Sequence, residues 1–332
     1  MAGSIHLGLT GDVMIGRGVD KAITQTGYLY PWGNVLPLLQ SAAINIINLE
    51  TALTNSEQQV PKVFNFKASP DKVKTLTAAH ITVANLANNH ILDFAEAGLL
   101  ETLRTLDGTG IQHTGAGMNE LQAAQPAIFK TPYGRAGVLG FTDNEYRWKA
   151  GPGRSGINYI DVGKLKDRQR ALTSIKHLRK AVDLLLVSIH WGPNMQEEPP
   201  DVFINFAHQM VHEGADVIHG HSAHIFQAVE VFNHKIILYD TGDFIDDYVI
   251  DPVLRNNLSF YFQLTISNKG IEGLQLFPVT ISHYQVNFSS QPEAEWSIRR
   301  LQQLSSRFGT SINADGEVLL QKSGAKSQPN GT

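Results

Sequence analysis

Residues 183–192, Asp-Leu-Leu-Leu-Val-Ser-Ile-His-Trp-Gly, are the stretch that decides the fold class. Residues 183–189 form the most apolar predicted strand of the chain, and His190 ends it, where Trp191-Gly192 takes the chain out of the sheet. Apolar strands that point metal- or phosphate-binding side chains at one edge of a sheet are how α/β proteins build such sites. The stretch therefore indicates an α/β fold with its chemistry at the strand ends.

Five further short stretches end predicted strands with residues that can hold a metal or a phosphate. They are Gly11-Asp12, Asn48-Leu49-Glu50, Asn88-Asn89-His90, Gly220-His221-Ser222-Ala223-His224 and Gly242-Asp243. Because the ends of parallel strands converge on one crevice, side chains that are far apart in sequence can meet there. The pattern predicts a metal-dependent active site at this crevice.

The first two thirds of the chain alternate predicted strands and helices, and the last third is mostly strand. Strands are predicted at residues 5–10, 43–48, 81–86, 183–189 and 217–219, with helices at 33–41, 71–79, 95–106, 164–181 and 202–212. Strands at 226–232, 235–239, 260–267 and 273–282 follow, and then a helix at 293–308. This order predicts one domain of two sheets packed face to face with helices outside. We assign residues 1–285 to that domain, 286–320 to a C-terminal helical extension and 321–332 to a disordered tail.

Composition excludes several classes of protein. The chain has no cysteine, which rules out a thiol nucleophile, a disulfide framework and a zinc–thiolate site. A metal must therefore bind to His, Asp, Glu, Asn or water, a set that suits Mn, Fe, Zn or Mg. The formal net charge of −4 gives no reason to expect a nucleic-acid partner. Residues 1–5 lack the pattern of a signal peptide, and no window reaches the roughly 18 apolar residues of a membrane span, so we expect a cytoplasmic protein.

Four of the 13 histidines stand at predicted strand ends and are candidates for chemistry. His221 and His224 share one turn after an apolar strand, where two imidazoles can reach one metal or two adjacent ones. His190 and His90 end two other strands. His219 lies inside a strand and is expected to face the core or support the site. The remaining histidines are interpreted as structural: His6, His80, His113, His177, His208, His212, His234 and His283.

Two carboxylates and one arginine complete the candidates that follow from the residues alone. Asp12 either binds a metal or serves as an ordinary turn or helix-cap residue. Glu50 follows a buried strand, where an unpaired charge is costly, so a metal or an arginine should neutralise it. Arg17 lies in a glycine-flanked loop, and its planar fork suits a phosphate or carboxylate, so it either binds substrate or pairs with Glu50.

Seven motifs follow one another over roughly residues 5–250 and carry a resemblance to a known family. They are residues 11–17, 48–50, 64–70, 87–90 with Asp93, 188–192, 220–224 and 239–244. In this order they resemble the CapA-like poly-γ-glutamate (capsule) synthesis proteins, which belong to the calcineurin-like metallophosphatase superfamily. The resemblance implies an α/β fold of the four-layer α/β/β/α sandwich type, two packed mixed sheets flanked by helices, with the site at the strand ends.

The resemblance also implies roles for individual residues. Metal ligands would be Asp12, Glu50 (bridging two metals), Asn89, His190, His221 and His224. His90 would be the general acid or transition-state stabiliser, and Arg17 is a second catalytic candidate. Arg17, Lys67 and Asn48 are predicted to contact the anionic group of the substrate.

The sequence departs from the wider superfamily at several of these positions. Met14 stands two residues after Asp12, where the superfamily usually has a histidine, and Glu50 replaces an aspartate. Ala223 replaces a proline found in many relatives. Glu197 and Glu198 are the nearest matches to a Glu-Tyr pair that family members often carry. The number of metal ions, one or two, therefore stays open.

Three functional hypotheses follow. The first is a metal-dependent hydrolase of a phosphoester or related anionic substrate, in which Mn, Fe or Zn activates water. The second is a non-hydrolytic accessory protein of poly-γ-glutamate or capsule synthesis that binds polymer or partner proteins. The third is a metal hydrolase with a (β/α)8 barrel, which the antiparallel character of the last third disfavours. The expected ligand is a small anionic or polyanionic substrate, and the oligomeric state is not predicted.

Overall fold

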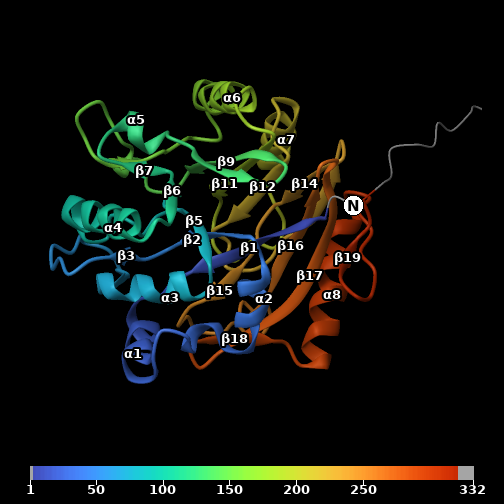
Figure 1. Ribbon diagram of the computed structural model, residues 1–332, viewed down its shortest axis with the longest axis horizontal. Coiled ribbons are helices and arrows are strands. Elements are labelled where there is room, and N and C mark those ends of the chain that lie inside the picture. The colour runs from blue at the N-terminus through green and yellow to red at the C-terminus, as the bar shows by residue number, and fades with distance from the viewer. Residues whose placement is uncertain (1–2, 321–332) are drawn as a thin grey trace, which may run out of the picture.

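Residues 3–320 of the computed structural model form two mixed β-sheets that pack face to face, with helices on both outer sides (Figure 1). The larger sheet has the order β18-β17-β16-β1-β2-β5-β6, and two short strands, β15 and β19, pair with β1 and β17. The smaller sheet has the order β13-β14-β12-β11-β9-β8. The predicted four-layer sandwich is confirmed, and a closed barrel of parallel strands is wrong because the strands divide into two separate sheets.

The strands of the larger sheet are β1 (Ile5–Val13), β2 (Ile44–Leu49), β5 (Ile81–Asn85), β6 (Gln112–Thr114), β15 (Asp243–Ile245), β16 (Leu258–Ser267), β17 (Gly270–Ser282), β18 (Gln285–Phe288) and β19 (Glu317–Val318). Those of the smaller sheet are β8 (Ala127–Thr131), β9 (Gly134–Thr142), β11 (Leu184–His190), β12 (Val217–His221), β13 (Val229–Phe232) and β14 (Lys235–Leu238). Two short pairs join β3 (Ala52–Leu53) to β4 (Lys67–Ala68) and β7 (Ala116–Gly117) to β10 (Gly156–Ile157).

Helices cover the outer face of each sheet. The larger sheet carries α1 (Arg17–Thr26), α2 (Leu36–Ser41), α3 (Val73–Ala78) and α4 (Ala95–Thr109). The smaller sheet carries α6 (Leu165–Arg179) and α7 (Asp201–His212), and α5 (Glu120–Ala123) contacts β7 and β10. No described helix combines the length and the apolar character that crossing a bilayer requires.

Two apolar cores hold these layers together. Side chains alternate between the two faces of a strand, so Ile46 of β2 belongs to the core between the sheets while Ile47 belongs to the core under α1–α4. Burying a side chain of this size contributes about 1.5–3 kcal/mol relative to its exposure. The alternation therefore fixes which face of β2 meets the second sheet, and with it the direction in which the strand ends point.

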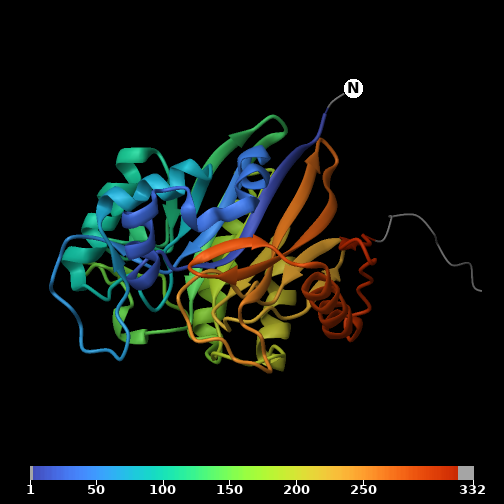
Figure 2. The same ribbon diagram turned by 90° about the horizontal axis from the view of Figure 1, so that it is seen from below.

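The C-terminal third is built into the larger sheet. β16 runs antiparallel to β1, and Figure 2 shows the two side by side. The predicted extension, residues 286–320, holds β18, α8 (Gln291–Ser306) and β19, and both strands pair with β17. Leu301 of α8 is fully buried in the core between the sheets. The segment thus shares the core of the rest, and the predicted disordered tail lies outside the described residues.

Candidate metal centre

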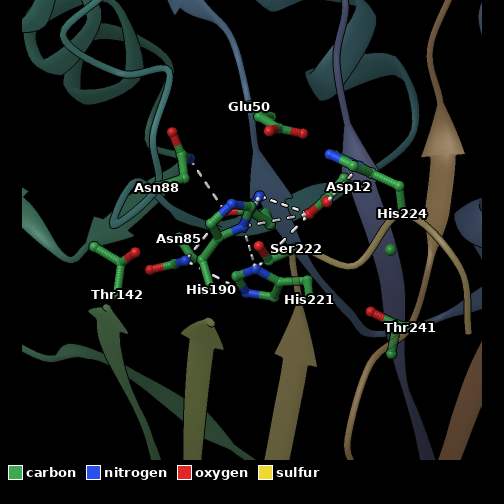
Figure 3. A network of polar contacts seen from close by, with 12 residues as sticks. Asp12, Glu50, Asn85, Asn88, Thr142, His190, His221, Ser222, His224 and Thr241 are labelled. Carbon is green, nitrogen blue, oxygen red and sulfur yellow. Dashed lines mark hydrogen bonds and ion pairs between the residues drawn. The ribbon is translucent and has the colours of Figure 1, made fainter. Parts of the chain in front are cut away.

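Polar side chains at the strand ends form two rows that face each other. In the larger sheet, Asp12 is in register with Asp243 on one side and Asn48 on the other. In the smaller sheet, His190 is in register with His221. Because the two sheets pack face to face, the rows meet, and Figure 3 shows the Asp12 carboxylate between His224 on one side and His190 and His221 on the other.

Glycines allow the backbone to approach closely just before these side chains. A Cβ atom on Gly11 would lie 2.0 Å from the carbonyl oxygen of Gly242, and one on Gly220 would lie 2.0 Å from that of Tyr239. Contacts of this length are impossible for any other residue. At the first position, the Asp12 N–H donates to the Gly242 carbonyl at 2.8 Å. Gly11 therefore lets the two chain segments that carry Asp12 and Asp243 lie against each other, and Gly220 lets the end of β12 lie against Tyr239.

Asp12, His190 and His221 form the first group that can hold a metal ion. Their ligand atoms lie within 4.8 Å of one another, and all three side chains are buried. Nδ1 of His190 is 3.0 Å from Nδ1 of His221, and the two nitrogens lie 3.8 and 3.7 Å from Oδ1 of Asp12. One carboxylate and two imidazoles at this spacing suit a transition-metal ion.

Asp12, His224 and Asp243 form the second group. Nδ1 of His224 lies 3.4 Å from Oδ2 of Asp12 and 2.8 Å from Oδ1 of Asp243. These ligand atoms again lie within 4.8 Å of one another. The two oxygens of Asp12 thus face different groups, which is the arrangement of a carboxylate that bridges two cations.

Unpartnered polar atoms mark the same place. Buried polar atoms of proteins almost always have a hydrogen-bond partner. Within residues 3–320, the following buried atoms of the candidate site have none: Oδ2 of Asp12, both carboxylate oxygens of Glu50, Oδ1 of Asn89, Nε2 of His190 and Oδ2 of Asp243. Four of these five residues are predicted ligands. Oxygen and nitrogen lone pairs without a proton donor fit a bound cation.

Neighbouring polar side chains fix the orientation of the candidate ligands. Ser188 Oγ lies 2.9 Å from Nε2 of His221, and a proton on this nitrogen leaves Nδ1 free to face Asp12. The Asn48 amide donates to Oδ1 of Asp12 at 2.7 Å, while its own oxygen accepts from Asn85 and Asn88 at 3.1 Å each. Asn48 is fully buried. These contacts occupy both of its amide atoms, so Asn48 orients Asp12, and its contact with a substrate stays a prediction.

The electrostatics of the site favour a cation. Burial alone would raise the pKa of Asp12, but His224, whose Nδ1 lies 3.4 Å from Oδ2, and the nearby His190 and His221 hold this pKa well below its usual range. Burial lowers the pKa of His190 to about 3 and that of His221 well below its usual value, so both imidazoles are neutral and able to bind a metal. Burial also raises the pKa of Glu50 and Asp243 well above the usual range. A divalent ion would relieve the cost of ionising these two carboxyls.

His90 lies beside the two groups. Its Nε2 is 3.7 Å from Oε1 of Glu50, and its Nδ1 is 2.6 Å from Oδ2 of the buried Asp93. The ring stacks on Phe66 with centroids 3.9 Å apart, and burial lowers the pKa of His90. Asp93 and Phe66 thus hold the imidazole with Nε2 turned toward Glu50.

Of the two alternatives for Arg17, pairing with Glu50 is wrong, and substrate binding stays a prediction. Arg17 pairs with Asp247, at 3.2 Å from Nε to Oδ2, and not with Glu50. Its side chain is 37% exposed, and its guanidinium lies 5.4 Å from the centre of the Phe66 ring. Arg17 is therefore at the rim of the site and reachable by a substrate.

Lys67 and Lys62 make different contacts. Lys67 donates to the Ser56 carbonyl and to Glu57 at 2.9 and 2.5 Å, which commits its ammonium group to the loop before β4. Lys62, which no motif singled out, reaches Oδ1 of Asp93 at 2.9 Å and also contacts the Asn89 carbonyl. Lys62 therefore places a second cationic side chain beside Asn89 and Asp93, and the substrate contact of Lys67 stays a prediction.

Glu197 and Glu198, the nearest matches to the family's Glu-Tyr pair, form ion pairs outside the candidate metal centre. They pair with Arg300 of α8 and with Arg307, the residue that follows α8, the second at 2.6 Å. Both are exposed surface pairs that attach the loop after β11 to the C-terminal helix.

Asp243 was not predicted as a ligand, although it lies in a group of clustered ligand atoms. The sequence did contain an indication of it, because Gly242-Asp243 is one of the six strand-end stretches.

Asp143 follows β9 at the same edge and provides a test of the buried electrostatics. Burial raises the pKa of Asp143 to about 6, although the Gly192 N–H donates to its carboxylate. A carboxyl whose pKa is raised on folding stabilises the protein below its unfolded pKa, and this stability is lost as the pH rises through about 6. Asp143→Asn should therefore raise the unfolding free energy at pH 8 by about 1–2 kcal/mol and leave it unchanged at pH 4. This range allows for solvent screening, because the Asp143 side chain is partly exposed. Urea unfolding at both pH values measures this, and an equal effect at both would refute it.

Comparisons with known proteins agree with the strand-end motifs. The family model described as bacterial capsule synthesis protein PGA_cap matches residues 6–248. A probable polyglutamine synthesis accessory protein of Mycobacterium tuberculosis is 31% identical, over 94% of each chain. The PGA biosynthesis protein CapA of Bacillus subtilis is 29% identical, over 82% of this chain and 70% of that one. The capsule biosynthesis protein CapA of Bacillus anthracis is 28% identical, over 82% of this chain and 66% of that one.

Two solved structures are also similar. The protein TT1561 of Thermus thermophilus gives a TM-score of 0.40 at 12% identity and covers 80% of this chain and 99% of its own. GAP50, the anchor in the inner membrane complex of Plasmodium, gives a TM-score of 0.41 at 9% identity and covers 91% of this chain and 96% of its own.

Proposed function

The chain belongs to the bacterial capsule synthesis protein family, and from this premise we propose that it is a metal-dependent hydrolase of a phosphoester or related anionic substrate. The observation that carries the proposal is the set of unpartnered buried atoms on Asp12, Glu50, Asn89, His190 and Asp243. Five separate segments of the chain deliver these atoms. A purely structural site would be expected to satisfy them with protein donors.

The donor set fits a divalent metal. It contains carboxylate, amide and imidazole groups and no thiolate, so Mn, Fe and Zn are the ions we expect, one or two per chain. Asp12 would bridge the two groups, with His190 and His221 on one side and His224 and Asp243 on the other. Divalent ions in such a site polarise a phosphoryl oxygen and lower the pKa of water toward about 7.

The remaining residues of the site would act on the substrate. His90 is held by Asp93 with Nε2 toward Glu50, where a protonated imidazole can donate a proton to the leaving oxygen. Arg17 and Lys62 give the site two cations, one half-exposed at the rim and one held by Asp93, for an anionic group. Phe66 packs between Arg17 and His90, which fixes both relative to each other.

A second candidate function is an accessory role without turnover, in which the site binds polymer or partner. Two observations favour it: the relative from Mycobacterium tuberculosis is named an accessory protein, and Met14 stands where the superfamily has a ligand histidine. The chain is related to the CapA proteins of capsule and poly-γ-glutamate biosynthesis, and this relation is compatible with either function. A cytoplasmic location and the absence of a nucleic-acid partner stay predictions.

Hydrolysis of a chromogenic phosphomonoester and phosphodiester separates the two functions. Purified protein is stripped of metal with a chelator, and Mn, Fe or Zn is then returned singly. The hydrolase proposal expects turnover that disappears with the chelator and returns with at least one ion. If the protein binds metal but hydrolyses neither ester with any ion, and still binds poly-γ-glutamate in equilibrium dialysis, the accessory function is the correct one.

A further inference from the structure

We propose that Tyr248 is a further catalytic residue, whose phenolic O–H donates a hydrogen bond to an oxygen of the phosphoryl group of the substrate. The inference rests on the proposed hydrolase function, and it adds a neutral hydrogen-bond donor to the residues that act on the substrate. Tyr248 lies outside the seven sequence motifs and stands three residues after the end of β15. Its role follows from where the folded chain places its ring.

The ring of Tyr248 lies beside both the candidate ligands and the proposed proton donor. It meets the His224 ring edge-on, with centroids 5.1 Å apart, and the Phe66 ring at 5.8 Å. The same Phe66 ring stacks on His90 at 3.9 Å. Tyr248 therefore adjoins the second group of ligand atoms through His224 and the proton donor through Phe66, which is where a substrate held by the centre would lie.

Contacts of the backbone and of the neighbouring residues hold the ring in this place. The Tyr248 N–H donates to Oδ1 of Asp246 at 2.8 Å, which fixes a tight bend after β15. Asp247 pairs with Arg17 at 3.2 Å and accepts from the Gly18 N–H at 2.9 Å, which attaches the segment to the start of α1. A donor that is held in position before the substrate arrives needs little reorganisation during the reaction.

The hydroxyl group of Tyr248 is available as a donor. The residue is half-buried, and its phenolic oxygen takes part in no hydrogen bond within residues 3–320. Buried tyrosine hydroxyls ordinarily have a partner. A phenol carries its proton at neutral pH, and burial, followed by the charges of Glu50, Asp243, Asp246 and Asp12, raises the pKa of Tyr248 further. The hydroxyl thus lies within the field of the carboxylates of the centre, as a proton donor without an acceptor.

Glu50 is not the acceptor of this hydroxyl. Both of its carboxylate oxygens are buried and unpartnered among the described residues, so no hydrogen bond joins them to Tyr248. The O–H is therefore left for a group that binds beside the centre. Phosphoryl transfer spreads negative charge over the non-bridging oxygens, and a positioned donor stabilises that charge. The proton stays on the phenol throughout, so proton transfer to the leaving oxygen remains with His90.

Tyr248→Phe tests the inference, because it removes the hydroxyl and keeps the ring that packs on His224 and Phe66. With the ion that gives the fastest turnover of the chromogenic ester, kcat should fall roughly 10²–10³-fold. The dissociation constant of inorganic phosphate, measured by equilibrium dialysis of the metal-loaded protein, should rise roughly 10-fold. Metal content and urea unfolding should match those of the wild type.

Tyr133→Phe is the matched control. Tyr133 directly precedes β9, whereas the other end of that strand, Thr142, is in register with His190 of the candidate centre. The control therefore removes a phenolic hydroxyl at the opposite edge of the sheet. Its kcat, phosphate affinity and metal content should equal those of the wild type.

Tyr248→Leu separates hydrogen bonding from packing, since it removes both the hydroxyl and the ring. A packing role predicts that Tyr248→Phe behaves as the wild type and that only Tyr248→Leu is impaired, and this pattern would overturn the inference. Loss of metal from Tyr248→Phe would also overturn it, because the phenol would then support a ligand and not the substrate. If the wild type hydrolyses neither ester with any ion, the proposed function itself fails and the catalytic role of Tyr248 falls with it. Turnover by the wild type and an unimpaired Tyr248→Phe would remove this inference alone.

Discussion

His90→Asn is expected to lower kcat for ester hydrolysis by roughly 10²–10⁴-fold while the metal content stays at the wild-type value. His90 belongs to neither group of clustered ligand atoms, and its Nδ1 is taken by Asp93 at 2.6 Å. Nε2 is the nitrogen that remains for proton transfer, and asparagine has no group that can donate a proton in its place. Steady-state kinetics with metal analysis of the same samples measures the effect.

Two further variants sharpen this expectation. Asp93→Asn should lower kcat less, by roughly 10–100-fold, because it leaves the imidazole in place and weakens only its support. His113→Asn is the control, because His113 is a partly exposed histidine that pairs with Asp107 and not with the site. A His90→Asn protein with full activity, or one that loses its metal, would remove the proton-donor role from our account.

Glu50→Gln is expected to act in opposite directions on activity and on stability. In metal-free protein both oxygens of Glu50 are buried without partners among the described residues, and burial and the charge of Asp12 raise its pKa. A neutral amide of the same shape needs no ionisation, so the variant should unfold with a free energy higher by about 1–3 kcal/mol at pH 8. It should also lose the stabilisation that added metal gives to wild type, together with measurable turnover.

The pH dependence checks the physical cause of this gain. Because the folded pKa of Glu50 is raised, the wild type loses stability as the pH rises through that value, and the advantage of Glu50→Gln should vanish below the ordinary glutamate pKa. Urea unfolding of metal-free protein at pH 8 and pH 4 measures both limits. A variant that is less stable than wild type at pH 8 would mean that Glu50 is satisfied by the protein and does not await a cation.

The sequence predicts the main layout of the site because strand ends are encoded locally. Asp12, His190, His221 and His224 each follow an apolar run, and the two groups of clustered atoms contain all four. Parallel pairing brings the ends to one edge regardless of the loops between them. The four-layer fold and the four central side chains therefore follow from the pattern of apolar runs and polar endings.

Other parts of the site depend on tertiary contacts that no local pattern specifies. Asp243 begins β15, a strand of three residues, and its pairing with Asp12 is set by where the C-terminal third returns to β1. Arg17 has two acidic candidates in the sequence, Glu50 and Asp247, and the fold brings it to the second.

The two lysines show the same limit in an irregular segment. Residues 54–66 contain no helix or strand, so their path over the site, and hence which lysine faces it, is decided by contacts with Asp93 and Glu57. Lys62 carries no neighbouring motif, whereas Lys67 stands within one. The resemblance pointed to Lys67, and only the packed structure shows that Lys62 contacts Asn89 and Asp93.

Anomalous diffraction from crystals grown with Mn²⁺ and Zn²⁺, recorded at both absorption edges, tests the central claim most directly. Our account predicts anomalous density beside the Asp12 carboxylate, within reach of the ligand atoms of His190 and His221 or of those of His224 and Asp243. Anomalous density only elsewhere on the protein, with none near Asp12, would contradict the metal centre and the proposals built on it.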